Sequence, residues 1–186
     1  MKKLLRIFVL VLPTAFCQLP IVSANNNSPL GSRSSSLGNA SVSLSDLWSV
    51  QNNQAGLGFL KKINTGIYYQ NKFMLKELGT KAFAFAIPTK SGTFGVCVSN
   101  FGYSMYSQNK YGLAFGKAFG EYVSAGVMMD YMESNISGYG KKGAFVAEAG
   151  IQAKALKNLT LGMHIFNFTR SKLINYNDER IPTIMR

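Results

Sequence analysis

Residues 111–131, YGLAFGKAFGEYVSAGVMMDY, decide the fold. Successive side chains of a β-strand point to opposite faces, so the residues of this stretch can be sorted by parity. The first arm carries mostly large apolar side chains on one face: Tyr111, Leu113, Phe115, Lys117 and Phe119. Its other face carries only small residues: Gly112, Ala114, Gly116, Ala118 and Gly120. Gly120 and Glu121 predict a tight reversal into a second arm.

The second arm repeats this division of the two faces. One face holds Val123, Ala125, Val127, Met129 and Tyr131, and the other holds Tyr122, Ser124, Gly126, Met128 and Asp130. A soluble β-sandwich turns its bulky apolar residues inward and its polar residues outward. The small or mixed face here would be a poor water-facing surface. A bulky band toward lipid and small or polar groups toward a lumen fit better, so the hairpin predicts an outer-membrane β-barrel.

The composition agrees with a transmembrane sheet. The 186 residues suffice for about one domain, and only 15% of them are charged, against roughly 25% in typical soluble domains. After the N-terminus no apolar run reaches the ~18 residues of a membrane helix. The net charge of +12 raises nucleic acid as a partner, but the basic residues are scattered, so none is expected. We expect these basic residues near strand ends and loops: Lys72, Lys76, Lys81, Lys90, Lys110, Lys141, Lys142, Arg170 and Lys172.

The N-terminus predicts export. Residues 1–24 have the form of a signal peptide, with a basic start, an apolar core over 4–16 and the small-residue cleavage site Val22-Ser23-Ala24. The predicted location is therefore the bacterial outer membrane, after cleavage behind Ala24. The mature chain would then keep only Cys97, which excludes an internal disulfide and is expected to be a small buried side chain.

From residue 63 onward the alternation predicts strand after strand. The expected spans are 63–73, 80–88, 93–102, 110–119, 121–132, 143–154 and 158–168, with an eighth strand beginning near Ile181. Short turns at 88–92, 120–121 and 156–158 alternate with longer polar connections near 74–79, 103–109, 133–142 and 169–180. Short periplasmic turns and longer external loops are typical of up-and-down outer-membrane barrels. Residues 63–186 are thus predicted to be antiparallel barrel wall.

Residues 25–62 lack this alternation. Residues 25–36 are rich in Asn, Ser and Gly and predict a loop. Ser45 or Asp46 is expected to cap a short helix through Leu47, Trp48 and Val50. Gly56 and Gly58 are expected to end that helix.

This segment resembles the opening signature of the FadL-like outer-membrane family. The residues that carry the resemblance are Gly31-Ser-Arg33-Ser-Ser-Ser-Leu37-Gly38-Asn-Ala40-Ser-Val42, then Asp46, Trp48-Ser49 and Asn53-Gln-Ala55-Gly56-Leu57. The branch that it resembles most is the PorV/PorQ type, which is linked to type IX secretion. The chain departs from the signature at Asn39, where a second glycine is usual, and at Gln54, where proline is usual.

The resemblance implies that residues 25–62 form a plug in the lumen of the barrel. The plug residues that it singles out are Arg33, Leu37, Gly38, Asp46, Trp48, Asn53 and Gly56. Trp48 is expected to pack against the inner wall rather than to contact a ligand. Because FadL-like barrels have about fourteen strands, the resemblance implies an N-terminal portion of a longer barrel. The alternative is a complete eight-stranded barrel whose interior side chains fill it.

The chemistry-bearing residues are few. One His and one mature Cys do not supply a structural zinc set, and neither a metal nor a cofactor is expected. Four polar residues fall on the predicted lumen side: Asp130, Glu148, Gln152 and His164. They leave a Ser-His-Asp arrangement open. The favoured interpretation is that Asp130, Glu148 and His164 pair without catalysis with Lys154, with Gln152 or with the plug backbone, because unpartnered burial would cost several kcal/mol.

Three functions follow as expectations. The first is a FadL-like barrel that binds or passes hydrophobic small molecules through a plugged lumen. The second is a PorV/PorQ-type accessory of secretion that acts through protein partners. The third, and least favoured, is a barrel enzyme acting on lipid, for which loss of activity in His164→Ala would be the test. Outer-membrane lipid is an expected partner in all three.

Overall fold

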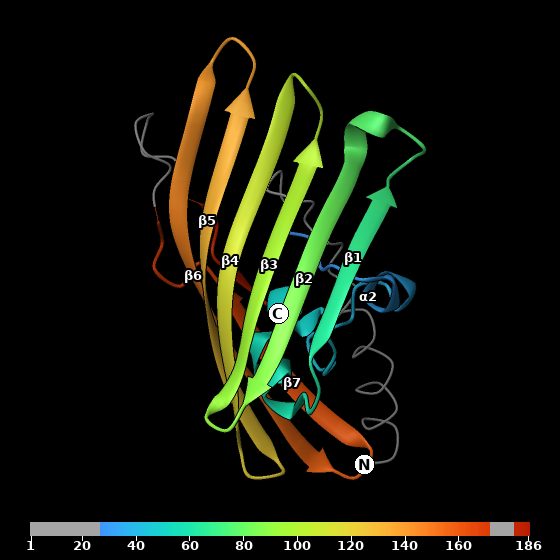
Figure 1. Cartoon of the computed structure of the whole chain (residues 1–186), viewed down its shortest axis with the longest axis vertical. Coiled ribbons are helices and arrows are strands. Elements are labelled where there is room, and N and C mark those ends of the chain that lie inside the picture. The colour runs from blue at the N-terminus through green and yellow to red at the C-terminus, as the bar shows by residue number, and fades with distance from the viewer. Residues whose placement is uncertain (1–26, 172–180) are drawn as a thin grey trace, which may run out of the picture.

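The computed structural model describes residues 27–171 and 181–186, so the predicted signal peptide and Lys172 lie outside it. The chain forms one antiparallel sheet of eight strands, in which each strand pairs with its neighbour in sequence. The strands are β1 (Asn64–Asn71), β2 (Gly79–Thr89), β3 (Gly92–Gly102), β4 (Tyr106–Phe119), β5 (Val123–Ile136), β6 (Gly140–Leu156), β7 (Leu159–Phe166) and β8 (Ile184–Met185) (Figure 1). The prediction of an all-β, up-and-down antiparallel architecture is confirmed.

The prediction of long polar loops is wrong at two of the connections. Strand β4 begins at Tyr106, and β5 and β6 leave only residues 137–139 between them. The polar residues expected in loops instead extend the ladder, since the Asn100 amide donates to Asn109 Oδ1 at 2.7 Å. On the next strand pair, the Asn109 amide reaches Glu133 Oε1 at 3.4 Å. The strands therefore continue beyond their apolar parts.

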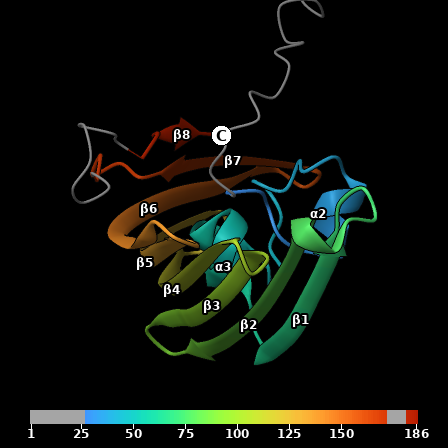
Figure 2. The ribbon, with the colours of Figure 1, turned by 90° about the horizontal axis from the view of Figure 1, so that it is seen from above.

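The sheet is curved and open. Figure 2 shows it curling around the short helix α3 (Ser49–Asn52), with β1 and β8 at its two edges. Strand β8 pairs with β7 at only two positions, and among the described residues no pairing joins β8 to β1. Long hairpins end at the top of Figure 1 and tight turns at the bottom.

The two faces of the sheet have the predicted division of size. On β2 the alanines Ala82, Ala84 and Ala86 are buried, while Phe83 between them is 44% exposed. The same holds across the convex face, where large apolar side chains are exposed: Ile67, Phe94, Val96, Leu113, Val127, Met129, Phe145, Ile151, Leu161 and Met163. The concave face carries the small residues and is covered by the preceding part of the chain.

Residues 27–62, here called the inner segment, lie against the concave face. They contain α2 (Ser32–Ser36), α3 and the 3₁₀-helix η1 (Gln54–Phe59). The predicted loop over 25–36 is therefore wrong where α2 forms. Neither Ser45 nor Asp46 caps α3, which follows Trp48 without a side-chain cap. Instead the Ser49 hydroxyl accepts a bond from the Asp46 amide at 3.0 Å and donates to the Leu44 carbonyl at 2.9 Å.

Glycines make room for the inner segment. Gly116, Gly126 and Gly150 are direct neighbours across β4, β5 and β6. A Cβ on Gly126 would lie 2.7 Å from the Ala55 amide nitrogen, and one on Gly116 would lie 2.8 Å from the Leu57 Cβ. This glycine row lets the backbone of η1 lie directly on the sheet, and Gly56 lies within η1 rather than ending a helix.

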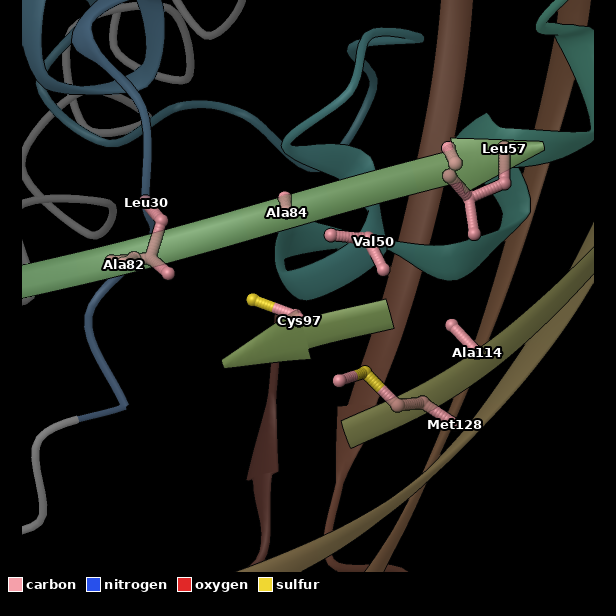
Figure 3. Close-up of a cluster of buried hydrophobic side chains, with 9 residues drawn as sticks. Leu30, Val50, Leu57, Ala82, Ala84, Cys97, Ala114 and Met128 are labelled. Atoms are coloured by element: carbon pink, nitrogen blue, oxygen red, sulfur yellow. The ribbon is translucent and has the colours of Figure 1, made fainter. Parts of the chain in front are cut away.

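An apolar core joins the inner segment to the concave face of the sheet, whose residues are here called the wall. Figure 3 shows Leu30, Val50 and Leu57 of the inner segment packed against mostly small side chains from four strands. These wall residues are Ala82, Ala84, Ala86, Cys97, Ala114 and Met128. Val50 and Leu57 are completely buried, and each such side chain contributes about 1.5–3 kcal/mol of burial free energy. In the described part of the chain, no helix has the length and apolar character needed to cross a membrane.

Candidate functional site

Four ionisable side chains meet on the concave face beneath the inner segment. They are Lys110 from β4, Asp130 from β5, Glu148 from β6 and His164 from β7, and we call them the charge cluster. Adjacent strands bring them together through the cross-strand pairs Gly112–Asp130, Met128–Glu148 and Gly150–His164. The Lys110 side chain is 6% exposed and the two carboxylates are fully buried.

Glu148 is the centre of the charge cluster. Its Oε1 accepts a bond from Lys110 Nζ at 2.6 Å. Its Oε2 lies 3.0 Å from His164 Nε2 and accepts a bond from Gln54 Nε2 at 2.9 Å. Because an ionised carboxylate only accepts, we assign the imidazole proton to Nε2. One wall carboxylate thus connects two other strands to the inner segment.

Asp130 is less well satisfied. Its Oδ2 forms an ion pair with Lys110 Nζ at 3.1 Å, but neither Oδ1 nor Oδ2 has a hydrogen-bond partner in the described part of the structure. The absence of a side chain at Gly112 leaves the space that this carboxylate occupies. The Lys110 ammonium also lies 5.3 Å from the centroid of the Phe166 ring, a favourable cation–π distance. One ammonium group therefore compensates two buried carboxylates.

Further polar contacts fasten the inner segment beside the charge cluster. Gln152 accepts a bond from the Ser45 hydroxyl at 3.1 Å and donates to the Ser43 carbonyl. The Asn53 amide donates to the Val42 carbonyl at 2.6 Å and to the Ile151 carbonyl of β6 at 3.3 Å. Gln152 thus contacts the inner segment and does not join the charge cluster.

Of the other residues singled out by the signature, some pack against the sheet and others are exposed. Trp48 packs edge-on against Tyr68 of β1, with ring centroids 5.5 Å apart. Arg33 lies 3.9 Å from Asp46, but its side chain is 63% exposed. Leu37 is exposed at the end of α2, and Gly38 has φ +64° with no neighbouring atom within 4 Å of an added Cβ.

Sequence reasoning missed two members of this site. Lys110 was expected near a strand end, whereas it lies inside β4 and is buried. Its parity matches that of Gly112, so extending the alternation of residues 111–119 by one position would have placed it on the concave face. The expected pairing with Lys154 is wrong, because Lys154 Nζ lies 3.9 Å from the centroid of the Phe59 ring. Gln54 was noted only as a departure from the signature.

The hydrogen bonds of the charge cluster join the inner segment to the sheet. The His164–Glu148 pair resembles a base with its orienting carboxylate, yet no described serine hydroxyl bonds to His164. Within residues 27–171 and 181–186, no group of three or more His, Cys, Asp or Glu side chains is placed to hold a metal ion. The charge cluster acts on its surroundings through Gln54, which it ties to the wall.

Comparison of this chain with family models, curated proteins and solved structures gives no match. The relation to FadL-like proteins is therefore a prediction that rests on the signature residues.

Proposed function

We propose that the curved sheet is the wall of an outer-membrane β-barrel of FadL-like type. In this proposal the inner segment is the plug of the lumen, and the protein binds or passes hydrophobic small molecules. The observation that carries the proposal is an inversion of polarity between the two faces. Lys110, Asp130 and Glu148 are buried on the concave face, whereas Ile67 on the convex face is 86% exposed.

The size of the exposed apolar surface supports a lipid environment. Leu113, Met129 and Phe145 come from three adjacent strands and are all more than 60% exposed. Soluble monomers rarely expose contiguous apolar patches larger than a few hundred Å². Lipid removes this cost, because hydrocarbon solvates such side chains as well as a protein interior does.

A second candidate function is favoured by the tips of the hairpins. Phe73 and Met74 in the β1–β2 connection are 83% and 94% exposed, and Tyr139 in the β5–β6 connection is 86% exposed. These tips lie beyond the polar rungs formed by Asn100 and Asn109, on the side of the long hairpins (Figure 1). Exposed aromatic and Met side chains are enriched at protein interfaces. A PorV/PorQ-type role, in which these tips hold a secreted or secretion-system protein, would use them.

The first test is to fractionate the cells that make the protein and to run the outer membrane on gels with and without boiling. We expect the protein in the outer membrane, with a faster band before boiling because a folded barrel resists detergent. Its absence from that membrane, or the same mobility under both conditions, would contradict the barrel.

Two further measurements separate the candidate roles. Vesicles containing the protein should take up a hydrophobic dye faster than empty vesicles if the first candidate holds. Crosslinking from a cysteine placed at Tyr139 should instead capture a specific protein partner, without dye uptake, if the second holds.

A further inference from the structure

A cavity of about 700 Å³ lies at the short-turn end of the sheet. It is bounded by the end of η1, by the β4–β5 turn and by the β6–β7 turn, at the bottom of Figure 1. Phe59, Tyr122 and Leu156 give it apolar walls. The cavity is separate from the charge cluster, and the functions proposed above make no use of it.

The charged side chains around this cavity are mostly basic. Lys61, Lys154 and Lys157 line it, against Glu121 alone. Among the described residues, none of the three lysines forms an ion pair with a carboxylate. The cavity therefore presents uncompensated positive charge next to apolar walls.

The fold aims Lys154 at this cavity. The pairing of β6 with β7 shifts register between Lys154 and Leu156, and such bulges redirect side chains. The Lys154 amide nitrogen donates to the Tyr122 carbonyl at 2.7 Å, which joins the β6 end to the β4–β5 turn. Its ammonium group lies 3.9 Å from the centroid of the Phe59 ring, so this exposed side chain reaches back over the inner segment at the edge of the cavity.

The level of the cavity also fits a membrane interface. Phe94, Phe119 and Tyr122 are exposed near the same end of the sheet, as in the aromatic belts that sit at head-group depth. Lysines at this depth attract anionic lipid head groups. An occupant with a negative head and a hydrocarbon chain would match both the lysines and the apolar walls.

We propose that this cavity binds the phosphate head group of an anionic phospholipid. The phosphate lies between Lys154 and Lys157, and the hydrocarbon chain runs along Leu156 and Tyr122. The inference rests on the proposed barrel, since it places the short turns at a membrane surface.

The test uses the whole protein extracted from the outer membrane in non-ionic detergent. Native mass spectrometry counts bound dioctanoyl phosphatidylglycerol, dioctanoyl phosphatidylcholine or inorganic phosphate. The double variant Lys154→Gln/Lys157→Gln is compared with Lys90→Gln/Lys117→Gln, which removes the same charge outside the cavity. We expect phosphatidylglycerol to bind the cavity variant about fivefold or more weakly, and the control variant to match the unaltered protein.

Each outcome has one meaning. Lysine-dependent binding of phosphatidylglycerol without binding of inorganic phosphate supports a lipid head group. Lysine-dependent binding of inorganic phosphate assigns the anion site to free phosphate and overturns the lipid as occupant. Equal binding by both double variants overturns the site altogether. If the boiled and unboiled samples still differ in mobility, that last result leaves the barrel standing; without the difference, the barrel itself fails.

Discussion

At the scale of single residues, Lys110 is the buried cation that faces two buried carboxylates. It is the only described ammonium group in contact with both Asp130 and Glu148, at 3.1 Å and 2.6 Å. Replacing a buried ion pair as a whole is often neutral, but removing one partner leaves an uncompensated charge in a low dielectric. The consequence of losing Lys110 should therefore far exceed that of losing any surface lysine.

The substitution Lys110→Met tests this asymmetry. It keeps the length of the side chain and removes the charge, so two buried carboxylates lose their cation. We expect the free energy of unfolding to fall by about 3–5 kcal/mol, measured by urea titration of the protein in detergent micelles.

A matched control lies on the same strand. Lys117 is exposed on the convex face, and Lys117→Met should change the free energy of unfolding by about 0.5 kcal/mol or less. Adding Asp130→Asn and Glu148→Gln to Lys110→Met should recover part of the loss. Equal effects of the two lysine substitutions would show that the charge cluster is not dehydrated in the folded protein.

At the scale of elements, the contact between η1 and the sheet depends on the absence of side chains. The glycine row of Gly116, Gly126 and Gly150 crosses three strands at one level. Two residues before Gly126 on β5, the Ser124 hydroxyl donates to the Ala55 carbonyl, so a hydrogen bond also joins the sheet to the inner segment. Any methyl group on the row must push η1 away from these partners.

The substitution Gly126→Ala is the smallest change that tests this fit. Its Cβ would meet the backbone of Gln54 and Ala55, which cannot rotate away as a side chain could. We expect a loss of about 1–3 kcal/mol in the free energy of unfolding, together with faster proteolysis within residues 49–59.

The control for this substitution is Ala149→Val on the neighbouring strand β6, which adds volume on the convex face. Its proteolysis pattern should match that of the unaltered protein. If the inner segment of Gly126→Ala is cleaved no faster, then η1 does not rest on the glycine row in solution.

The elements also show how far the sequence could predict this fold. The strands were predictable because period-two alternation is a local property, visible in residues 81–87 as Phe and Ile against Ala. The extension of β5 and β6 into residues 133–142 was not predictable. Asn, Ser and Lys are common both in loops and at the polar ends of strands, so their presence does not distinguish the two. The parities of Glu148 and His164 indicated their shared face, but the pairing of Glu148 with Lys110 depends on strand register, which no local pattern determines.

At the scale of the whole molecule, the two faces of the sheet lie in different surroundings. The concave face meets the inner segment, while the convex face exposes large apolar side chains on every strand from β1 to β7. Whether lipid or water contacts the convex face decides between a membrane-spanning sheet and a water-soluble one. A charge placed on that face distinguishes the two.

The substitution Leu113→Arg provides this charge near the middle of β4, at a position that is 68% exposed. In lipid vesicles it should cost about 2–4 kcal/mol, because arginine must be buried in hydrocarbon. On a water-exposed face the same change would cost about 0.5 kcal/mol or less. The folded fraction of vesicle-bound protein in urea, seen by mobility without boiling, measures the difference.

The control places the same charge at a turn. Asn158→Arg, in the β6–β7 turn, should leave the midpoint of unfolding unchanged because its side chain reaches the aqueous interface. If Leu113→Arg behaves like Asn158→Arg, the convex face is not in hydrocarbon.

The central position of Glu148 in the charge cluster also has a consequence for the order in which the strands and the inner segment assemble. His164 lies in the same hairpin as Glu148, but the partners Gln54 and Lys110 lie 94 and 38 residues away in the sequence, so the β6–β7 hairpin alone cannot bring the Lys110 ammonium group to it. A β6 strand that crossed the bilayer alone would carry a bare carboxylate into hydrocarbon, at a cost of several kcal/mol. If the sheet spans a membrane as proposed, the hairpins would have to pair with one another, and with the inner segment, while Glu148 is still hydrated. In the proposed membrane barrel, insertion into the bilayer would therefore be a late and collective step, in which the sheet and the inner segment enter together.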